Sequence, residues 1–276
     1  MPTIGEFKPG QQLKILAYGM SKVGKTEGAA TFPRPCFLDF DRGITTLTSP
    51  GFIKRHGYRP GIIYEQFVER NVDSRGVVKD HNAFDDGCRY FDKMMQKDNV
   101  DTFDTWVVDT GTSLSEAAMN KAIVLLGSDK FKGNTSNTLK MGQQFGLVLP
   151  KQQDFGSERS MVEQFILMVK DTPKHVVFLC HEKELFDADG DLRAVVPLLT
   201  GKGVEAICAM FDEVWNIRTR PKGPERFVYA QTVSDGFRKC GSRLGIPNET
   251  AWNYESITQA LNTLNQEKEK LTNASH

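Results

Sequence analysis

Short runs of apolar residues recur along the chain and predict the strands of a buried sheet. The runs are LKILAYG (13–19), PCFLDF (35–40), DTWVVDT (104–110), KHVVFLCH (174–181), EVWNIRT (213–219) and RFVYAQTV (226–233). Nearly continuous apolar strands are typical of a mostly parallel sheet that is covered on both faces. Only RPKGPE separates the last two runs, so we expect them to form an antiparallel hairpin at one edge of the sheet.

Helical patterns lie between several of these runs. Residues 84–96, 113–126 and 157–170 repeat apolar side chains at the spacing of a helix face. Ser157 is a candidate N-cap at the start of the last segment. Strand and helix patterns that alternate along a chain predict the α/β class.

A further helix is predicted near the C-terminus, within YESITQALNTLNQEKEKL. Its apolar residues lie along one stripe: Ile257, Leu261, Leu264 and Leu271. Such a stripe most often packs on its own domain, and the alternative is a contact with another subunit. We expect the last five residues, TNASH, to be disordered.

The composition and charge of the chain indicate an ordinary globular protein. The chain has 276 residues, of which 39% are hydrophobic and 25% are charged, as in ordinary globular proteins. Its 35 Lys and Arg residues balance 35 Asp and Glu residues, so any surface for nucleic acid must be a local patch.

Five scattered cysteines without a Cys-x-x-Cys pair argue against a disulfide framework and a zinc site. Because no run resembles a signal peptide or a membrane span, we expect a cytoplasmic protein.

The most specific motif is a phosphate-binding loop, GMSKVGKT (19–26), which fits G-x-x-x-x-G-K-[ST] at every fixed position. Gly19 and Gly24 allow a tight turn that directs successive backbone N–H groups toward phosphate oxygens. Lys25 is placed to neutralise the β- and γ-phosphates, and the Thr26 hydroxyl is placed to bind Mg²⁺. The alternative is a glycine turn with an exposed lysine. The predicted ATP-binding residues are Gly19, Met20, Ser21, Lys22, Val23, Gly24, Lys25, Thr26 and Glu27.

Asp109 is the candidate for a second metal ligand. It ends the apolar run that begins at Trp106 and is followed by Thr-Gly-Thr. Open α/β sheets bind ligands at the carboxyl ends of their strands, and an aspartate there can hold the water shell of Mg²⁺. Alternatively, Asp109 caps the next helix, although Ser113 or Ser115 could do so instead. The sequence therefore predicts Thr26 and Asp109 as the metal-binding pair.

After the phosphate loop, PCFLDFDRG, DTWVVDTGTSL and HVVFLCHEKEL follow in an order that resembles RecA/RadA-type ATPases. Over residues 12–245 the chain is similar to small phage-encoded members, which include AAA-type nucleotide-binding proteins and single-strand-annealing recombinases. The resemblance implies a RecA-like P-loop domain over 1–250, with an amphipathic helix and tail over 251–276. It also implies Mg-ATP hydrolysis on single-stranded DNA, in phage recombination, annealing or replication, by a ring or filament in a bacterial host.

The resemblance also implies a residue that orients the attacking water. In the family this is an acidic residue just beyond the second core strand, and Asp41 occupies the matching position. Asp39, at the end of the same apolar run, is the alternative. The family more often has glutamate here, so the shorter Asp41 is expected to support slow turnover. Asp41 could instead cap a helix before Gly43.

His181 matches the polar residue that senses the γ-phosphate in this family. Relatives carry Gly-His at this place, whereas this chain has Cys180 followed by His181. Alternatively, His181 is an ordinary histidine at the end of a strand.

The family completes its site across a subunit boundary with basic residues that follow the last strands. In GFRKCGSRLG, Arg243 is the first candidate and Lys239 the second, and Arg238 lies in the same region. A cation from a neighbouring subunit would stabilise charge on the transferring phosphoryl group. The alternative is a basic loop in solvent.

Two loops are implied as DNA contacts. One is the polar, basic segment 128–155, which is long enough to be functional or mobile, and the other follows His181. Lysines near an aromatic residue suit the backbone and bases of single-stranded DNA, although solvated loops also carry lysines. The predicted DNA-binding residues are Lys130, Phe131, Lys132 and Lys140 in the first loop, and Arg193 and Lys202 in the second.

Two other functions stay open at this point. One is a nucleotide-dependent switch, or a helicase-loader-type protein, that recruits a single-strand-binding or replication protein and hardly turns ATP over. The other is a small-molecule phosphotransferase, which should carry an arginine-rich lid. Residues 128–155 contain lysines but no arginine.

Overall fold

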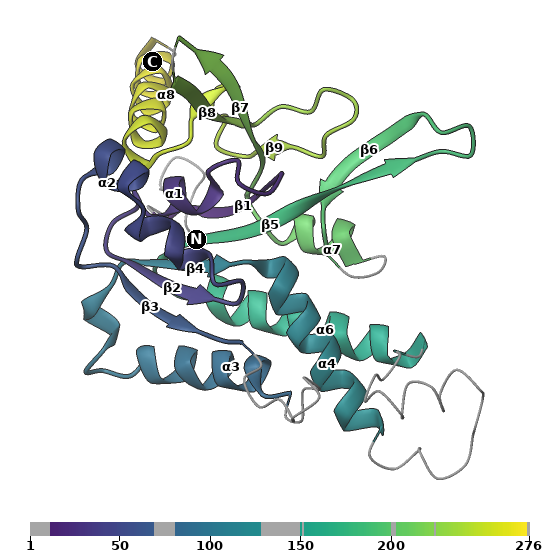
Figure 1. Cartoon of the computed structure of the whole chain (residues 1–276). Coiled ribbons are helices and arrows are strands. Elements are labelled where there is room, and N and C mark those ends of the chain that lie inside the picture. The colour runs from purple at the N-terminus through teal and green to yellow at the C-terminus, as the bar shows by residue number, and fades with distance from the viewer. Residues whose placement is uncertain are drawn as a thin grey trace.

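Strands and helices alternate in the computed structural model, which describes residues 12–68, 81–127, 150, 152–199, 203–223 and 225–274 (Figure 1). The strands are β1 (Lys14–Gly19), β2 (Pro35–Asp39), β3 (Ile63–Gln66), β4 (Thr105–Asp109), β5 (His175–Phe186), β6 (Leu192–Pro197), β7 (Glu213–Lys222), β8 (Glu225–Gln231), β9 (Gly241–Ser242) and β10 (Thr250–Ala251). The α-helices are α1 (Lys25–Ala29), α2 (Pro50–His56), α3 (Ala83–Met94), α4 (Gly111–Gly127), α6 (Gln152–Lys170), α7 (Val204–Ala209) and α8 (Tyr254–Ala274). Short 3-10 helices cover Gly43–Thr48 (η2) and Val100–Thr102 (η3).

The centre of the sheet is parallel. Neighbouring strands follow the order β10-β8-β7-β1-β5-β4-β2-β3, and the pairs from β7 to β3 are all parallel. β2 and β4 are buried throughout, and β1 is buried after its first residue, which explains their continuous apolar runs. The predicted mostly parallel α/β sheet is therefore confirmed.

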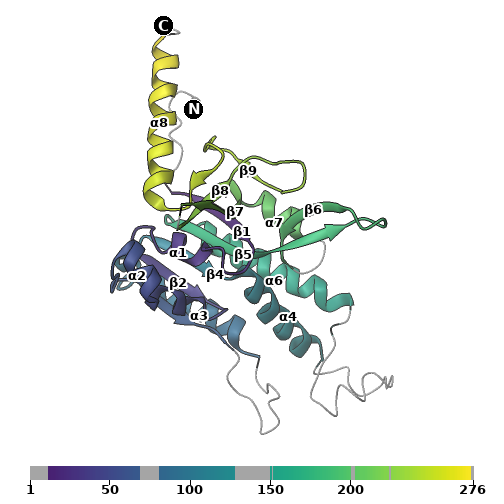
Figure 2. The same cartoon turned by 45° about the horizontal axis from the view of Figure 1, so that its top comes forward.

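Helices cover both faces of this sheet (Figures 1 and 2). Val108 belongs to a core that includes residues of α3, α4 and α6, whereas Val107 belongs to a second core with residues of α1, α2 and α8. Successive side chains of a strand point to opposite faces, so one strand supplies both cores. Each large side chain buried in this way stabilises the fold by roughly 1.5–3 kcal/mol.

The predicted antiparallel hairpin is also confirmed. β7 and β8 pair antiparallel, with Arg220 opposite Phe227, and β10 continues the edge beyond β8. This edge packs beside the phosphate-binding loop, because a side chain at Gly24 would lie 3.4 Å from Val228 of β8.

β5 is longer than its apolar run predicts. Its first part lies between β1 and β4, and from Glu182 onward it pairs antiparallel with β6. The resulting hairpin projects from the body of the molecule (Figure 1). Residues 183–186 are exposed, so the burial pattern that marks the inner strand is missing there.

The helix predicted over 157–170 begins earlier than expected. α6 starts at Gln152, so Ser157 is not an N-cap and instead lies inside the helix, where its hydroxyl donates to the Gln153 carbonyl at 3.5 Å. The first turns bury Asp154 and Glu158, and buried polar residues conceal the start of a helix from an apolar pattern.

The C-terminal helix packs on its own domain through its first half. Ile257 is buried, and Leu261 and Leu264 pack against the same core, whereas Leu271 is 71% exposed. α8 continues through Ala274, so three of the five residues expected to be disordered are helical. The far half of α8 projects from the body (Figure 2).

In the described ranges, every helix is too short or too polar to cross a lipid bilayer.

Candidate functional site

The phosphate-binding loop connects the central strand β1 to α1. A side chain at Gly19 would lie 2.5 Å from the carbonyl oxygen of Ile217, so the neighbouring strand leaves room only for glycine. Gly24 has a φ angle of 106° and Lys22 one of 63°, both in the left-handed region that turns the chain sharply. The chain between β1 and α1 therefore forms the tight turn that the phosphate-binding motif predicts.

Lys25 lies beneath this loop. Its side chain is 6% exposed, and Nζ donates to the carbonyl oxygens of Gly19 and Met20, each at 2.8 Å. Burial lowers the pKa of Lys25, and the nearby charge of Asp109 opposes this shift. Because these partners are neutral carbonyls, they do not neutralise the ammonium group, which can also pair with an anion in the loop.

Asp109 ends β4 and faces the loop. Its side chain is 2% exposed, and the Thr26 hydroxyl donates to Oδ2 at 2.8 Å. Burial raises the pKa of Asp109 to about 7, although the hydrogen bond from Thr26 opposes this shift and the charge of Asp39 adds to it. A buried carboxylate with a raised pKa beside a hydroxyl is a favourable environment for a divalent cation.

The chemistry of this pair fits Mg²⁺. Carboxylate and hydroxyl oxygens are the hard ligands that Mg²⁺ prefers, and it usually takes only one or two of them together with substrate phosphates. Among the residues that the structure describes, no group of three or more His, Cys, Asp or Glu side chains could hold a metal ion. Thr26 and Asp109 therefore suit a cation that is shared with bound phosphates.

Asp39 and Asp41 have different environments. Asp39 is fully buried and accepts from the backbone N–H of Asp41 at 3.2 Å and of Gly43 at 2.9 Å. It also accepts from Gln66 Nε2 at 3.0 Å. These bonds show that Asp39 stabilises the turn after β2. Of these two aspartates, Asp41 is the one that lines the pocket beside the phosphate-binding loop.

The structure brings Asp41 and His181 together. His181 Nε2 lies 3.3 Å from Oδ2 of Asp41, and the side chain of Asp41 is 44% exposed. The His181 backbone is held where β5 leaves the parallel sheet, because its N–H donates to Oγ1 of Thr112 at 3.0 Å and its carbonyl accepts from the Leu198 N–H at 2.7 Å.

The predicted residues from four segments line one pocket. Ser21, Lys22, Gly24, Lys25, Thr26 and Glu27 come from the phosphate-binding loop and α1, Asp41 follows β2, Asp109 ends β4, and His181 lies in β5. Four further residues line the pocket without belonging to a motif that predicts it: Gly43, Thr46, Thr110 and Arg226. Arg226 had no local signal, because only the packing of β8 beside the loop brings it to this pocket.

The basic residues after β8 lie elsewhere. Lys239 and Arg243 line a second pocket, where Lys239 pairs with Glu205 at 3.4 Å and Arg243 with Asp212 at 2.7 Å. Arg243 follows β9, which pairs with the start of β7, whereas the phosphate-binding loop follows the end of the parallel strand β1. Arg243 therefore lies at the opposite end of the sheet from the phosphate-binding loop of its own chain.

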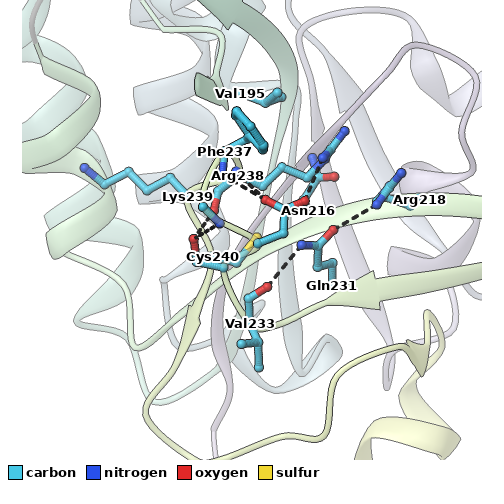
Figure 3. A network of polar contacts seen from close by, with 12 residues as sticks. Val195, Asn216, Arg218, Gln231, Val233, Phe237, Arg238, Lys239 and Cys240 are labelled. Atoms are coloured by element: carbon cyan, nitrogen blue, oxygen red, sulfur yellow. Dashed lines mark hydrogen bonds and ion pairs between the residues drawn. The ribbon is translucent and has the colours of Figure 1, made fainter. Parts of the chain in front are cut away.

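Arg238 is held within its own chain. Its guanidinium pairs with Asp235 at 2.7 Å, in a polar network that joins the segment after β8 to Val195 of β6 (Figure 3). The predicted DNA contact Arg193 is exposed on β6. The other predicted DNA contacts lie outside the described residues: Lys130, Phe131, Lys132, Lys140 and Lys202.

The strand order, the phosphate-binding loop and the strand-end carboxylate define a P-loop nucleotide-binding domain. Residues 11–240 match the protein family described as "AAA domain", and the chain belongs to this family. The predicted α/β P-loop fold with a mostly parallel sheet is thus confirmed, as is membership of the AAA-type family.

The solved structures that are similar to the chain include the following two. A KaiC-like protein from Pyrococcus horikoshii OT3 is 13% identical, with 79% of this chain and 76% of that chain covered and a TM-score of 0.36. The flagellar accessory protein FlaH from Methanocaldococcus jannaschii is 10% identical, with 83% and 80% covered and a TM-score of 0.35. Both TM-scores are low, so the assignment depends on the chain's own sheet order, its motif and the family match. No curated protein sequence matches the chain significantly.

Proposed function

We propose that this protein binds Mg·ATP, hydrolyses it slowly, and acts on single-stranded DNA in phage recombination, annealing or replication. The observation that carries the ATPase proposal is the contact between Thr26 and Asp109 at 2.8 Å, in the same pocket as Lys25 and Asp41. This pocket combines a phosphate-binding loop, a candidate metal pair and a carboxylate that can accept a proton.

In this proposal each residue has a defined role. Lys25 neutralises charge on the phosphates, and Thr26 and Asp109 hold Mg²⁺, which when bound offsets the charge of the β- and γ-phosphate oxygens. Water attacks the γ-phosphorus, the bond to the bridging oxygen breaks, and the carboxylate of Asp41 accepts the proton of the water. His181, at 3.3 Å from Asp41, orients this carboxylate and responds to the γ-phosphate.

The proposed action on DNA depends on the family resemblance and on exposed basic residues. Arg193 is exposed on the projecting β5–β6 hairpin, and β5 leads back to His181 in the nucleotide pocket. This continuity would let nucleotide state influence a DNA-binding surface. The proposed ring or filament would bring Arg243 or Lys239 to the pocket of a neighbouring subunit.

A steady-state ATPase assay tests the proposal, with and without single-stranded DNA. We expect slow Mg²⁺-dependent turnover that single-stranded DNA increases, and no turnover by the Lys25→Ala variant. For the contact between subunits, inactive Arg243→Ala and inactive Lys25→Ala proteins are mixed. Activity above the average of the two separate proteins supports a residue supplied in trans, and activity equal to that average contradicts it.

A second candidate function is a nucleotide-dependent switch or helicase-loader-type protein with little turnover. The short side chain of Asp41, in contact with His181, favours it, because a carboxylate must reach the γ-phosphate through one water to act as a base. Tight ATP binding without hydrolysis, with or without DNA, would favour this candidate over the first.

A further inference from the structure

Arg226 of β8 lines the nucleotide pocket beside the phosphate-binding loop. Its Nη1 donates to the backbone carbonyl oxygen of Lys22 at 3.0 Å. Lys22 has a φ angle of 63°, a conformation that residues other than glycine adopt at a cost. The hydrogen bond from Arg226 therefore helps to hold the loop where a residue other than glycine has a positive φ angle.

The direction of the Arg226 side chain follows from the strand that carries it. Side chains in a strand alternate between faces, so Arg226 shares a face with Val228, whose methyl group would lie 3.4 Å from a side chain at Gly24. Phe227 lies on the other face, where the Arg220 guanidinium is 5.1 Å from its ring centroid. The pleat of β8 thus directs Arg226 toward the phosphate-binding loop, whereas Arg220 of β7 contacts Phe227 on the other face.

The strand itself is anchored to the loop. The Trp252 N–H donates to the Val228 carbonyl, and Trp252 Nε1 donates to the Lys25 carbonyl, both at 3.0 Å. β8 is therefore connected to the start of α1 through a buried tryptophan. The backbone of β8, which carries Arg226, is therefore held at a fixed distance from the phosphate-binding loop.

The charges of the pocket leave Arg226 available to an anion. The acidic side chains nearby have other partners: Glu27 pairs with Arg55 at 2.7 Å, Asp41 contacts His181, and Asp109 accepts from Thr26. A guanidinium has five N–H donors, and within the described part of the chain the Arg226 guanidinium donates only to Lys22. Its planar group suits two parallel hydrogen bonds to a phosphate.

We propose that Arg226 is a nucleotide-binding residue that the chain supplies to its own site, where its guanidinium donates to phosphate oxygens of the bound nucleoside triphosphate while it holds Lys22. This inference depends on the proposed ATP binding. It differs from the predicted roles of Lys239 and Arg243, which require a second subunit.

The test compares the dissociation constants of a fluorescent ATP analogue for the wild type, Arg226→Ala, Arg226→Lys and Arg220→Ala. Arg220→Ala is the matched control, because it removes the same charge from the same hairpin on the face away from the pocket. We expect Arg226→Ala to weaken binding roughly tenfold, Arg226→Lys to restore part of the loss, and Arg220→Ala to stay close to the wild type.

Unchanged affinity in Arg226→Ala would overturn the inference, and so would an equal loss in Arg220→Ala, which would indicate a general effect of charge. If Arg226→Ala does not fold, Arg226→Lys decides: the retained charge without the planar group should weaken binding measurably at an unchanged melting temperature, and wild-type affinity would count against Arg226. Failure of the wild type to bind the analogue would instead contradict the proposed function.

Discussion

The Thr26 hydroxyl donates a hydrogen bond of 2.8 Å to Oδ2 of Asp109, across 83 positions of sequence. This bond joins the first turn of α1 to the end of β4, and the strand β5 lies between β4 and β1. The fold therefore sets the distance between a hydroxyl from the phosphate-binding loop and a buried carboxylate, which is the arrangement that a shared Mg²⁺ ion requires.

Asp109→Asn should lower Mg²⁺-dependent ATP turnover without lowering the free energy of unfolding. The asparagine keeps the shape of the side chain but removes a carboxylate whose pKa burial raises to about 7. Without nucleotide, the free energy of unfolding at pH 8 should stay equal or rise, because no charge is then buried. Mg²⁺-dependent ATP turnover should fall on the order of 100-fold. Denaturant unfolding and a coupled ATPase assay measure the two quantities, and full turnover in the variant would remove Asp109 from the metal site.

Asp41→Asn should retain ATP binding and lose turnover. The amide cannot accept a proton from water, and general-base catalysis typically contributes about 100- to 10,000-fold. Nucleotide affinity by fluorescence titration and turnover under saturating ATP give the two readouts. The exposed Asp98→Asn on the segment after α3 controls for a lost surface charge. Turnover equal to the wild type in Asp41→Asn would assign the base to another group.

Gly28→Ala should destabilise the fold and loosen the phosphate-binding loop. An added methyl group would lie 2.1 Å from Cδ1 and 2.2 Å from Nε1 of Trp252, and Trp252 donates to the Lys25 carbonyl. Overpacking of this kind costs about 1–3 kcal/mol, measured as the free energy of unfolding. Gly156→Ala in α6 is the control, because nothing lies within 4 Å of its added methyl, and it should be neutral or stabilising by about 0.5–1 kcal/mol. Equal effects of the two substitutions would contradict the packing.

Stability should depend on pH through His175. Its Nδ1 accepts from the Leu13 N–H at 3.0 Å, and burial, followed by the charge of Lys14, lowers its pKa. The unfolded state binds more protons than the folded state just below the ordinary pKa of about 6.5. The contribution of neutral His175 is therefore present above pH 6.5 and is lost as the pH falls toward the folded pKa.

The measurement for His175 is the free energy of unfolding at pH 7.5 and at pH 5.5. The wild type should lose more stability between these values than His175→Gln, whose side chain does not titrate. An equal loss in both proteins would show that other groups cause the acid sensitivity.

The parts of the fold that could be predicted are those that short sequence patterns determine. Buried parallel strands such as β4 are continuous apolar runs, and the turn from Gly19 to Thr26 depends on local glycines. The start of α6 and the outer half of β5 were missed because their own residues do not form the apolar pattern of a buried helix or strand. Arg226 was missed because only the packing of β8 beside the loop brings it to the pocket. The separation of Arg243 from the pocket depends on the directions in which β7 and β9 run.

The central claim is that residues 19–27 bind Mg·ATP, and calorimetric titration of the wild type and Lys25→Ala with a slowly hydrolysed ATP analogue tests it most directly. Lys93→Ala, which removes an exposed lysine on α3, is the control for charge and should bind like the wild type. We expect saturable, Mg²⁺-dependent binding by the wild type and none by Lys25→Ala at an unchanged melting temperature. The same affinity in the wild type and in folded Lys25→Ala would contradict the account.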